Sequence, residues 1–291
     1  MRFLITNDLH QQNQKWKLTV AAVKAEKPQW VFITGDILPK EPFTLASQRD
    51  FFKHIERYLT EMKSLGVEEV FTYLGNDDMA LLEGELDALQ DKELCRNMNN
   101  VVNVWGESAI AGMPFVRDYP FGMKTWCAPD FPHVVNPVQY TTPVTMGGDG
   151  QWLNIPNLAD YLKSKKSIGT MLDELDAKIP VNEKPNAVYM VHQPPSLCGM
   201  DICGNGAEVG SPTVLTFIER TQPLLTMHGH IHESPYMTGG CWHKQVGRTH
   251  VIQPGQLGTK LHYVTADIEG GSVKRLAWYH SRSPFKEVLE F

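Results

Sequence analysis

Two pairs of residues with metal-ligand chemistry follow apolar runs in this 291-residue chain. His230 and His232 come after the run 223–227, and Asp8 and His10 come after the N-terminal run. Residues two apart on an extended backbone point to the same side, so each pair can aim at one target. The spacing predicts a metal site. For His-x-His alone, the alternative is an ordinary pair of partly buried histidines.

Three further apolar runs also end in polar residues that can bind a metal. They deliver Asp36, then Asn76 with Asp77 and Asp78 behind it, and finally His192. Short, nearly continuous apolar runs are typical of buried strands in an α/β sheet, and ligands of open sheets bind beyond the carboxyl ends of the strands. We therefore expect all five runs to deliver their last residues into one crevice.

In this order, the blocks resemble the signature of the calcineurin-like metallophosphoesterases, and of their phosphodiesterase branch in particular. The blocks are Asp8-Leu9-His10, Gly35-Asp36, Gly75-Asn76-Asp77-Asp78, His192 and Gly229-His230-Ile231-His232. A later turn at 253–256 resembles the Asn-Pro-Gly-Ser turn of that family, so the resemblance spans nearly the whole chain. Five independent blocks make the metal interpretation much stronger than any single motif does.

The resemblance implies an α/β fold built as a four-layer α/β/β/α sandwich, with two metal ions in its crevice. It divides the ligands into two groups that share Asp36: Asp8, His10, Asp36 and His232 for one ion, and Asp36, Asn76, His192 and His230 for the other. These donors suit manganese, iron, zinc or cobalt and do not choose among them. The implied reaction is hydrolysis of a small-molecule phosphoester, with phosphodiesters favoured, by a metal-bridging hydroxide. The alternatives are a phosphomonoesterase and a catalytically weak binding scaffold of the same fold.

One candidate catalytic residue departs from the family pattern, which usually has histidine after Gly-Asn where this chain has Asp77. An aspartate with an ordinary pKa of about 3.9 is a poor proton donor at neutral pH. Asp77 is therefore either a solvated loop carboxylate or a cause of preference for acidic leaving groups, with His133 the next candidate donor. Asn76 and Asp78 complete the candidate catalytic set, and we expect Asp78 to orient a ligand such as His10.

Helix and strand patterns alternate through most of the chain, which we expect to form one domain over residues 1–291. Apolar spacing predicts helices at 15–25, 48–63, 79–94 and 158–178. Ser211 and Pro212 suit the N-cap and first turn of a later helix. Gly270 and Gly271 predict a hairpin turn between two C-terminal strands.

The alternation breaks at about 105–152, where aromatic residues and prolines concentrate. This composition predicts an irregular insertion. Such a segment either selects substrate beside the metal site or covers a sheet edge or an oligomer contact, and a homo-oligomer is compatible with the sequence. Within the insertion, Arg117 is the expected phosphate contact.

Charge and hydropathy weigh against several classes of protein. The chain has 27 basic and 33 acidic residues, a net charge of −6, so no overall basic field would attract nucleic acid. No apolar segment approaches the ~20 residues of a membrane span, and the first strand begins too early for a signal peptide, so we expect a cytoplasmic protein. The five cysteines form no Cys-x-x-Cys pair and are expected to be free thiols.

Overall fold

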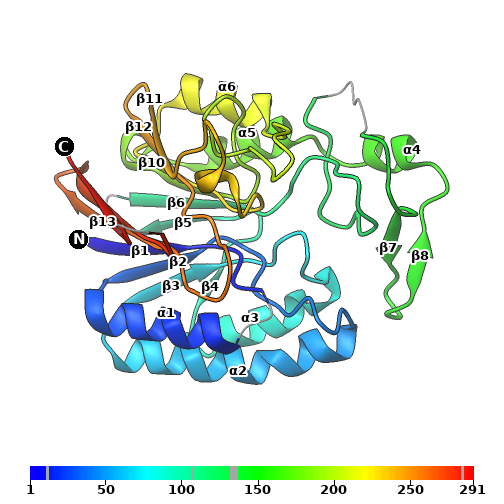
Figure 1. Cartoon of the computed structure of the whole chain (residues 1–291), viewed down its shortest axis with the longest axis horizontal. Helices are drawn as coiled ribbons and strands as arrows, with labels where there is room; N and C mark the ends of the chain where they lie inside the picture. The colour runs from blue at the N-terminus through cyan, green and yellow to red at the C-terminus, as the bar shows by residue number, and fades with distance from the viewer. Residues whose placement is uncertain (11–12, 106–107, 132–136, 283–284) are drawn as a thin grey trace.

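The computed structural model describes residues 1–10, 13–105, 108–131, 137–282 and 285–291. The chain is mixed α/β, as predicted, with two large sheets packed between helices (Figure 1). The first sheet contains, in spatial order, β15 (Lys286–Glu290), β14 (Ser272–Tyr279), β13 (Tyr263–Glu269), β1 (Arg2–Thr6), β2 (Trp30–Ile33), β3 (Glu69–Thr72) and β4 (Arg96–Asn97). Strands β1 to β4 run parallel, and β13 joins β1 antiparallel.

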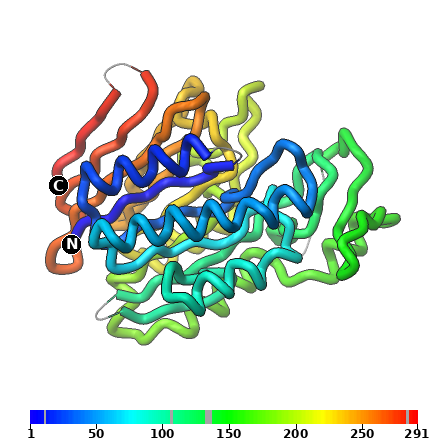
Figure 2. The backbone as a smooth tube through the Cα atoms, turned by 90° about the horizontal axis from the view of Figure 1, so that it is seen from below, coloured from blue at the N-terminus to red at the C-terminus, as the bar shows by residue number. Residues whose placement is uncertain are grey.

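Helices connect the parallel strands of the first sheet and cover its outer face. They are α1 (Asn13–Glu26), α2 (Leu45–Ser64), the short η1 (Ala80–Leu82) and α3 (Glu83–Asp91). Figure 2, seen from below, shows α1 and α2 lying over this sheet and running alongside β1. The helices predicted at 15–25 and 48–63 thus occur at about the expected positions. The helix predicted at 79–94 is divided into η1 and α3.

The second sheet lies against the inner face of the first. Its strands, in spatial order, are β11 (His243–Val246), β12 (Thr249–Ile252), β10 (Leu225–Met227), β9 (Val188–Val191), β6 (Ser108–Met113) and β5 (Val102–Trp105). Helices α5 (Ile168–Lys178) and α6 (Pro212–Thr221) cover its outer face (Figure 1). As predicted, Ser211 caps α6, since its side chain accepts a hydrogen bond from the backbone N–H of Val214.

Alternating side chains of each strand fill separate cores. In β1, Leu4 packs in a cluster with residues of α1 to α3, whereas Phe3 packs in a second cluster with residues of the opposite sheet such as Met190. A third cluster joins the second sheet to the outer helices, with Tyr189 and Leu172 among its members. Full burial of one such aliphatic or aromatic side chain contributes about 1.5–3 kcal/mol. These cores fix both sheets, and with them the strand ends that hold the site.

Two expectations about the middle of the chain were wrong. The segment Ser108–Met113, expected to begin the irregular insertion, forms the strand β6. Its small and apolar side chains are buried on both faces of the second sheet, Ile110 in one core and Ala109 and Met113 in the other. The single helix expected at 158–178 is divided into α4 (Leu158–Lys163) and α5. Ser167 ends the connection between them by accepting a hydrogen bond from the backbone N–H of Thr170, which starts α5.

The rest of the insertion projects from the body of the protein and contains the small ribbon of β7 (Val144–Met146) and β8 (Trp152–Asn154) (Figure 1). It is tied to the sheet loops by Trp126, whose indole N–H donates to the carbonyl of Asp78 at 2.8 Å. Among the described residues no helix is long and apolar enough to cross a membrane. All five cysteines are free thiols, as predicted.

Candidate metal centre

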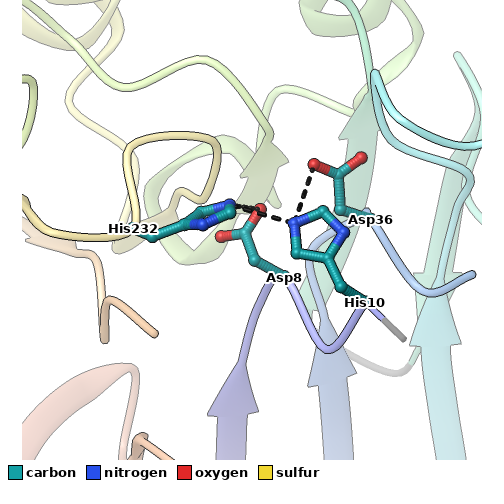
Figure 3. A group of neighbouring side chains, drawn as sticks. All are labelled: Asp8, His10, Asp36 and His232. Atoms are coloured by element: carbon teal, nitrogen blue, oxygen red, sulfur yellow. Dashed lines mark hydrogen bonds and ion pairs between the residues drawn. The ribbon is translucent and has the colours of Figure 1, made fainter. Parts of the chain in front are cut away.

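The predicted ligands meet where the strands of both sheets end. Asp8, His10, Asp36 and His232 each offer a ligand atom, and these atoms all lie within 4.8 Å of one another (Figure 3). Asp8 and His10 follow β1 and Asp36 follows β2, while His232 comes from the loop after β10 in the other sheet. Residues far apart in the sequence therefore converge as the strand-end pattern predicted.

The distances within this first group suit convergence on one cation. Nε2 of His10 lies 3.0 Å from Nε2 of His232 and 3.6 Å from Oδ2 of Asp36. Nε2 of His232 lies 3.4 Å from Oδ1 of Asp8. Two imidazole nitrogens and two carboxylates facing a common centre are a donor set that binds transition metals.

A second group adjoins the first and includes the amide of Asn76. Its Oδ1 lies 2.9 Å from Nε2 of His192 and 2.7 Å from Nδ1 of His230. Nε2 of His192 is 3.5 Å from Oδ2 of Asp36, the oxygen that also faces His10. This Oδ2 atom is buried and has no hydrogen-bond partner among the residues that the structure describes. An unsatisfied carboxylate oxygen between two sets of donors fits a shared metal ligand.

The backbone at the site is held in an uncommon conformation. Four of the candidate ligands have left-handed backbones: φ is 48° at Asp8, 39° at His10, 51° at Asp36 and 69° at His230. Such angles are strained for non-glycine residues and tend to occur at functional sites. The expectation that strand alternation directs His230 and His232 to the same side was wrong, because β10 ends at Met227. A turn brings both side chains to the site.

Glycines make the close approach of the ligand loops sterically feasible. A Cβ atom on Gly75 would lie 2.3 Å from both the backbone nitrogen and Oδ1 of Asp36. A Cβ atom on Gly35, where φ is +83°, would lie 2.8 Å from Nδ1 of His192. Both positions therefore require glycine if Asp36 and His192 are to keep their places.

Hydrogen bonds from neighbouring backbone groups orient the ligands. Nδ1 of His192 lies 2.7 Å from the carbonyl oxygen of Thr34, which places the proton on Nδ1 and leaves Nε2 free to bind. The backbone N–H of His230 donates to Oδ1 of Asp8 at 3.1 Å. His228 has a different role, because both of its ring nitrogens are engaged by neighbouring carbonyl and hydroxyl groups within the protein.

Burial and mutual charge shift the pKa values of the ligands in opposite directions. Burial acts to raise the pKa of Asp36, but the adjacent imidazoles, His192 foremost, hold it well below its usual value. Burial acts to lower the pKa of His192, but Asp36 and Asp8 raise it to about 9. Burial, with the charge of His192, lowers the pKa of His230 to about 3. The site thus combines ionised carboxylates with imidazoles, and a cation would compete with the proton on His192.

Asp78 has a different structural role from the one expected. Its carboxylate does not orient His10, but accepts 2.9 Å hydrogen bonds from the backbone N–H groups of Gly75, Ile37 and Leu38. Asp78 therefore clamps the loop after β2 to the loop after β3. The sequence expectation failed because a buried carboxylate between two loops is satisfied by the nearest backbone donors, which the chain order does not reveal.

Sequence reasoning missed Lys40, whose ammonium group forms an ion pair with the carboxylate of Asp77. The side chains of Lys40 and Asp77 are 36% and 24% exposed, so the pair lies partly open to solvent beside the ligand groups. Asp77 is therefore not an isolated loop carboxylate. The only available signal was the position of Lys40, four residues after Asp36 in a ligand loop.

Arg117 is engaged by other parts of the protein. Its Nη1 donates to the carbonyl of Gly210, its Nε lies 3.7 Å from Oδ2 of Asp130, and its backbone N–H donates to Oε1 of Gln193 at 2.9 Å. The contacts with Gly210 and Gln193 link the insertion to the loop after β9, and a phosphate contact by Arg117 stays a prediction. His133 lies outside the described residues.

Solved structures with a similar fold include proteins from distant organisms. A dimetal phosphatase from Danio rerio is 12% identical and aligns over 100% of this chain and 99% of its own, with a TM-score of 0.55. A Thermus thermophilus protein is 14% identical, with coverages of 99% and 98% and a TM-score of 0.52. A Plasmodium protein, the anchor in the inner membrane complex, is 11% identical, with coverages of 100% and 89% and a TM-score of 0.53. At these identities the likeness shows the fold alone.

Family membership follows from the sequence match. No curated protein matches the sequence significantly. Residues 1–234 match the family model of calcineurin-like phosphoesterases, and this range contains every predicted metal ligand. The chain therefore belongs to the calcineurin-like phosphoesterase family.

Proposed function

We propose that this metal-dependent phosphoesterase is a phosphodiesterase that uses two metal ions. The family uses dinuclear metal centres, and the observation that supports two ions here is the position of Asp36 between two donor groups. The first ion is assigned to Asp8, His10, Asp36 and His232, and the second to Asp36, Asn76, His192 and His230. Manganese, iron, zinc and cobalt all suit these donors.

The protein contributes the geometry on which such chemistry depends. When bound, the two cations supply a water of lowered pKa and neutralise charge on the phosphoryl oxygens. Asp8 and Asp36 provide the negative charge that holds them, and His192, fixed by Thr34, presents Nε2 to the site. Because these ligands are buried and locked by backbone contacts, little rearrangement is needed when substrate binds.

The charge beside the ligand groups supports a diester in preference to a monoester. A phosphodiester carries one negative charge, whereas a phosphomonoester carries nearly two at neutral pH. The cation of Lys40 is offset by Asp77, so this pair adds no net positive charge for a dianion. The absence of a histidine after Asn76 also favours acidic leaving groups, which depart without a proton donor.

A row of aromatic rings leads outward from the site and could hold the second substituent of a diester. The ring of Tyr119 lies 5.8 Å from that of His230, Phe121 lies 6.2 Å from Tyr119, and Tyr140 lies 6.1 Å from Phe121, all between ring centroids. Phe121 and Tyr140 are 58% and 71% exposed, so their faces are available to a flat, apolar group. This supports aryl or nucleoside esters as the small-molecule substrates.

The test compares two substrates with the same leaving group. Protein reloaded with Mn²⁺ is assayed with bis(4-nitrophenyl) phosphate and with 4-nitrophenyl phosphate, and kcat/KM is expected to be higher for the diester. Asp36→Ala is the matched inactive control, since its loss of metal ligands abolishes activity that belongs to this site. Higher kcat/KM for the monoester would reverse the assignment, and activity that survives in Asp36→Ala would indicate a contaminant.

A further inference from the structure

Lys40 and Asp77 are held side by side by a buried residue outside the ligand set. Gln48, in α2, is fully buried, and its Nε2 donates to the carbonyl of Pro39 at 3.0 Å and to the carbonyl of Asp77 at 2.9 Å. Its Oε1 accepts from the backbone N–H of Met79 at 2.9 Å. One amide side chain therefore fixes the residue before Lys40 and the backbone of Asp77 at the same time, so the ion pair is not a chance contact of two mobile side chains.

The pair is also attached directly to the metal ligands. The backbone N–H of Asp77 donates to Oδ1 of Asp36 at 2.8 Å. The residue that pairs with Lys40 is therefore hydrogen-bonded directly to the shared ligand. The charge of Lys40 reaches the site as well. Burial acts to raise the pKa of Asp36, but the neighbouring imidazoles and Lys40 lower it.

The ammonium group of Lys40 is available to bind a ligand. An ammonium group has three donor hydrogens. Among the described residues, Lys40 forms an ion pair with Asp77 alone. The side chain is 36% exposed, so the other donors are accessible. A phosphoryl group held between the two ligand groups would bring its anionic oxygens to this edge of the site, where a cation binds them as charge-assisted hydrogen bonds.

We propose that Lys40 binds an oxygen of the substrate phosphoryl group, and that Asp77 and Gln48 are positioning residues that hold its ammonium group at the site. This rests on the proposed phosphoesterase function. The family pattern has histidine where this chain has Asp77, and here the carboxylate of Asp77 holds a cation from the neighbouring loop. A carboxylate alone at this position would repel the substrate, and Lys40 removes that repulsion.

Binding of inorganic phosphate to the Mn²⁺-loaded protein tests the proposal without requiring turnover. Calorimetric titration is carried out on wild type, Lys40→Ala, Lys40→Arg and Lys53→Ala, with metal content measured for each. Lys53 is the matched control, because it lies in α2 with its side chain 80% exposed and pairs with Asp50. We expect Kd for phosphate to rise about tenfold or more in Lys40→Ala, to stay within about threefold of wild type in Lys40→Arg, and to be unchanged in Lys53→Ala.

Kinetics on the diester then separate this inference from the proposed function. If the wild type cleaves the diester, and Lys40→Ala has unchanged phosphate affinity and unchanged kcat/KM, the role of Lys40 is overturned. The proposed phosphodiesterase function then still stands. Phosphate affinity that depends on Lys40 in a protein that cleaves no diester supports the role of Lys40 and overturns the proposed function. Loss of metal in Lys40→Ala would show that Lys40 acts on the metal ligands instead, which also overturns the proposal.

Discussion

The backbone N–H of Asp77 donates a 2.8 Å hydrogen bond to Oδ1 of Asp36. Because this oxygen is occupied, Oδ2 is the atom that faces the imidazoles, 3.6 Å from Nε2 of His10 and 3.5 Å from Nε2 of His192. The two oxygens of the Asp36 carboxylate therefore have different roles. One oxygen holds the neighbouring ligand loop, and the other stands between the two donor groups.

Replacing Asp36 with alanine should remove metal from both positions. Elemental analysis of Mn²⁺-reloaded protein is expected to approach two equivalents for wild type and to fall toward zero for Asp36→Ala, because one carboxylate serves both donor groups. Asp50→Ala is the control, since Asp50 is an exposed carboxylate that pairs with Lys53 on α2. A variant that still binds one ion tightly would show that Asp36 is a ligand of a single position.

Metal affinity should increase with pH up to about 9. Burial acts to lower the pKa of His192, but Asp36 and Asp8 raise it to about 9, so the metal-free protein keeps a proton on this imidazole below that pH. A bound cation needs the neutral ring, so binding releases this proton. Affinity should thus rise by up to about tenfold per pH unit below 9 and level off above it.

Calorimetric Mn²⁺ titrations at several pH values, in buffers of different ionisation enthalpy, measure both quantities. The buffer dependence of the heat reports proton release, expected to be near one per protein at about pH 7 and near zero above about pH 9.5. Affinity that is constant between pH 7 and 9, with no proton release, would show that His192 is neutral before metal binds.

The strand-end ligands were predictable because their signals are local. Each buried strand is a short apolar run, and parallel strands of one sheet end at one edge, so Asp8 and Asp36 had to meet there. His192 follows β9 of the second sheet, and the packing of the two sheets brings it to the same place. The relation of Asp77 to Lys40 was not predictable in this way. It depends on Gln48 in a third segment, which joins two loops through their backbone carbonyls.

The same limit applies to the fold. The strand Ser108–Met113 was hidden because its residues stand beside a segment rich in proline and aromatics, and only its pairing with β9 and β5 identifies it. The break between α4 and α5 was hidden because Lys165 and Lys166 have good helix propensity; the cap at Ser167 decides the start of α5. Tertiary partners, not composition, settle such positions.

Arg117→Ala should test the insertion's part in substrate choice. The guanidinium contacts Asp130 and the carbonyl of Gly210, so its loss should lower the free energy of unfolding by about 1 kcal/mol. If the insertion selects substrate, KM should rise while kcat and metal content stay near wild type. Denaturation and steady-state kinetics measure both effects. Destabilisation with unchanged kinetics on every substrate would make Arg117 a structural link alone.

Asp77→Asn should shift the preference of the enzyme toward monoesters. The amide keeps the size of the side chain but removes its negative charge, so the cation of Lys40 is no longer offset. A dianionic monoester gains more from this extra positive charge than a monoanionic diester does. We expect the ratio of kcat/KM for bis(4-nitrophenyl) phosphate over 4-nitrophenyl phosphate to fall about three- to tenfold at about pH 8.

The two esters release the same nitrophenolate, so leaving-group acidity is constant and the ratio reports charge at the site. Asp50→Asn, which alters an exposed carboxylate on α2, should leave the ratio unchanged. Lys40→Ala removes the cation and keeps the carboxylate, so it should move the ratio in the opposite direction, toward the diester. If Asp77→Asn and Lys40→Ala moved the ratio in the same direction, the pair would act through the shape of the ligand loops, and the electrostatic basis for diester preference would be wrong.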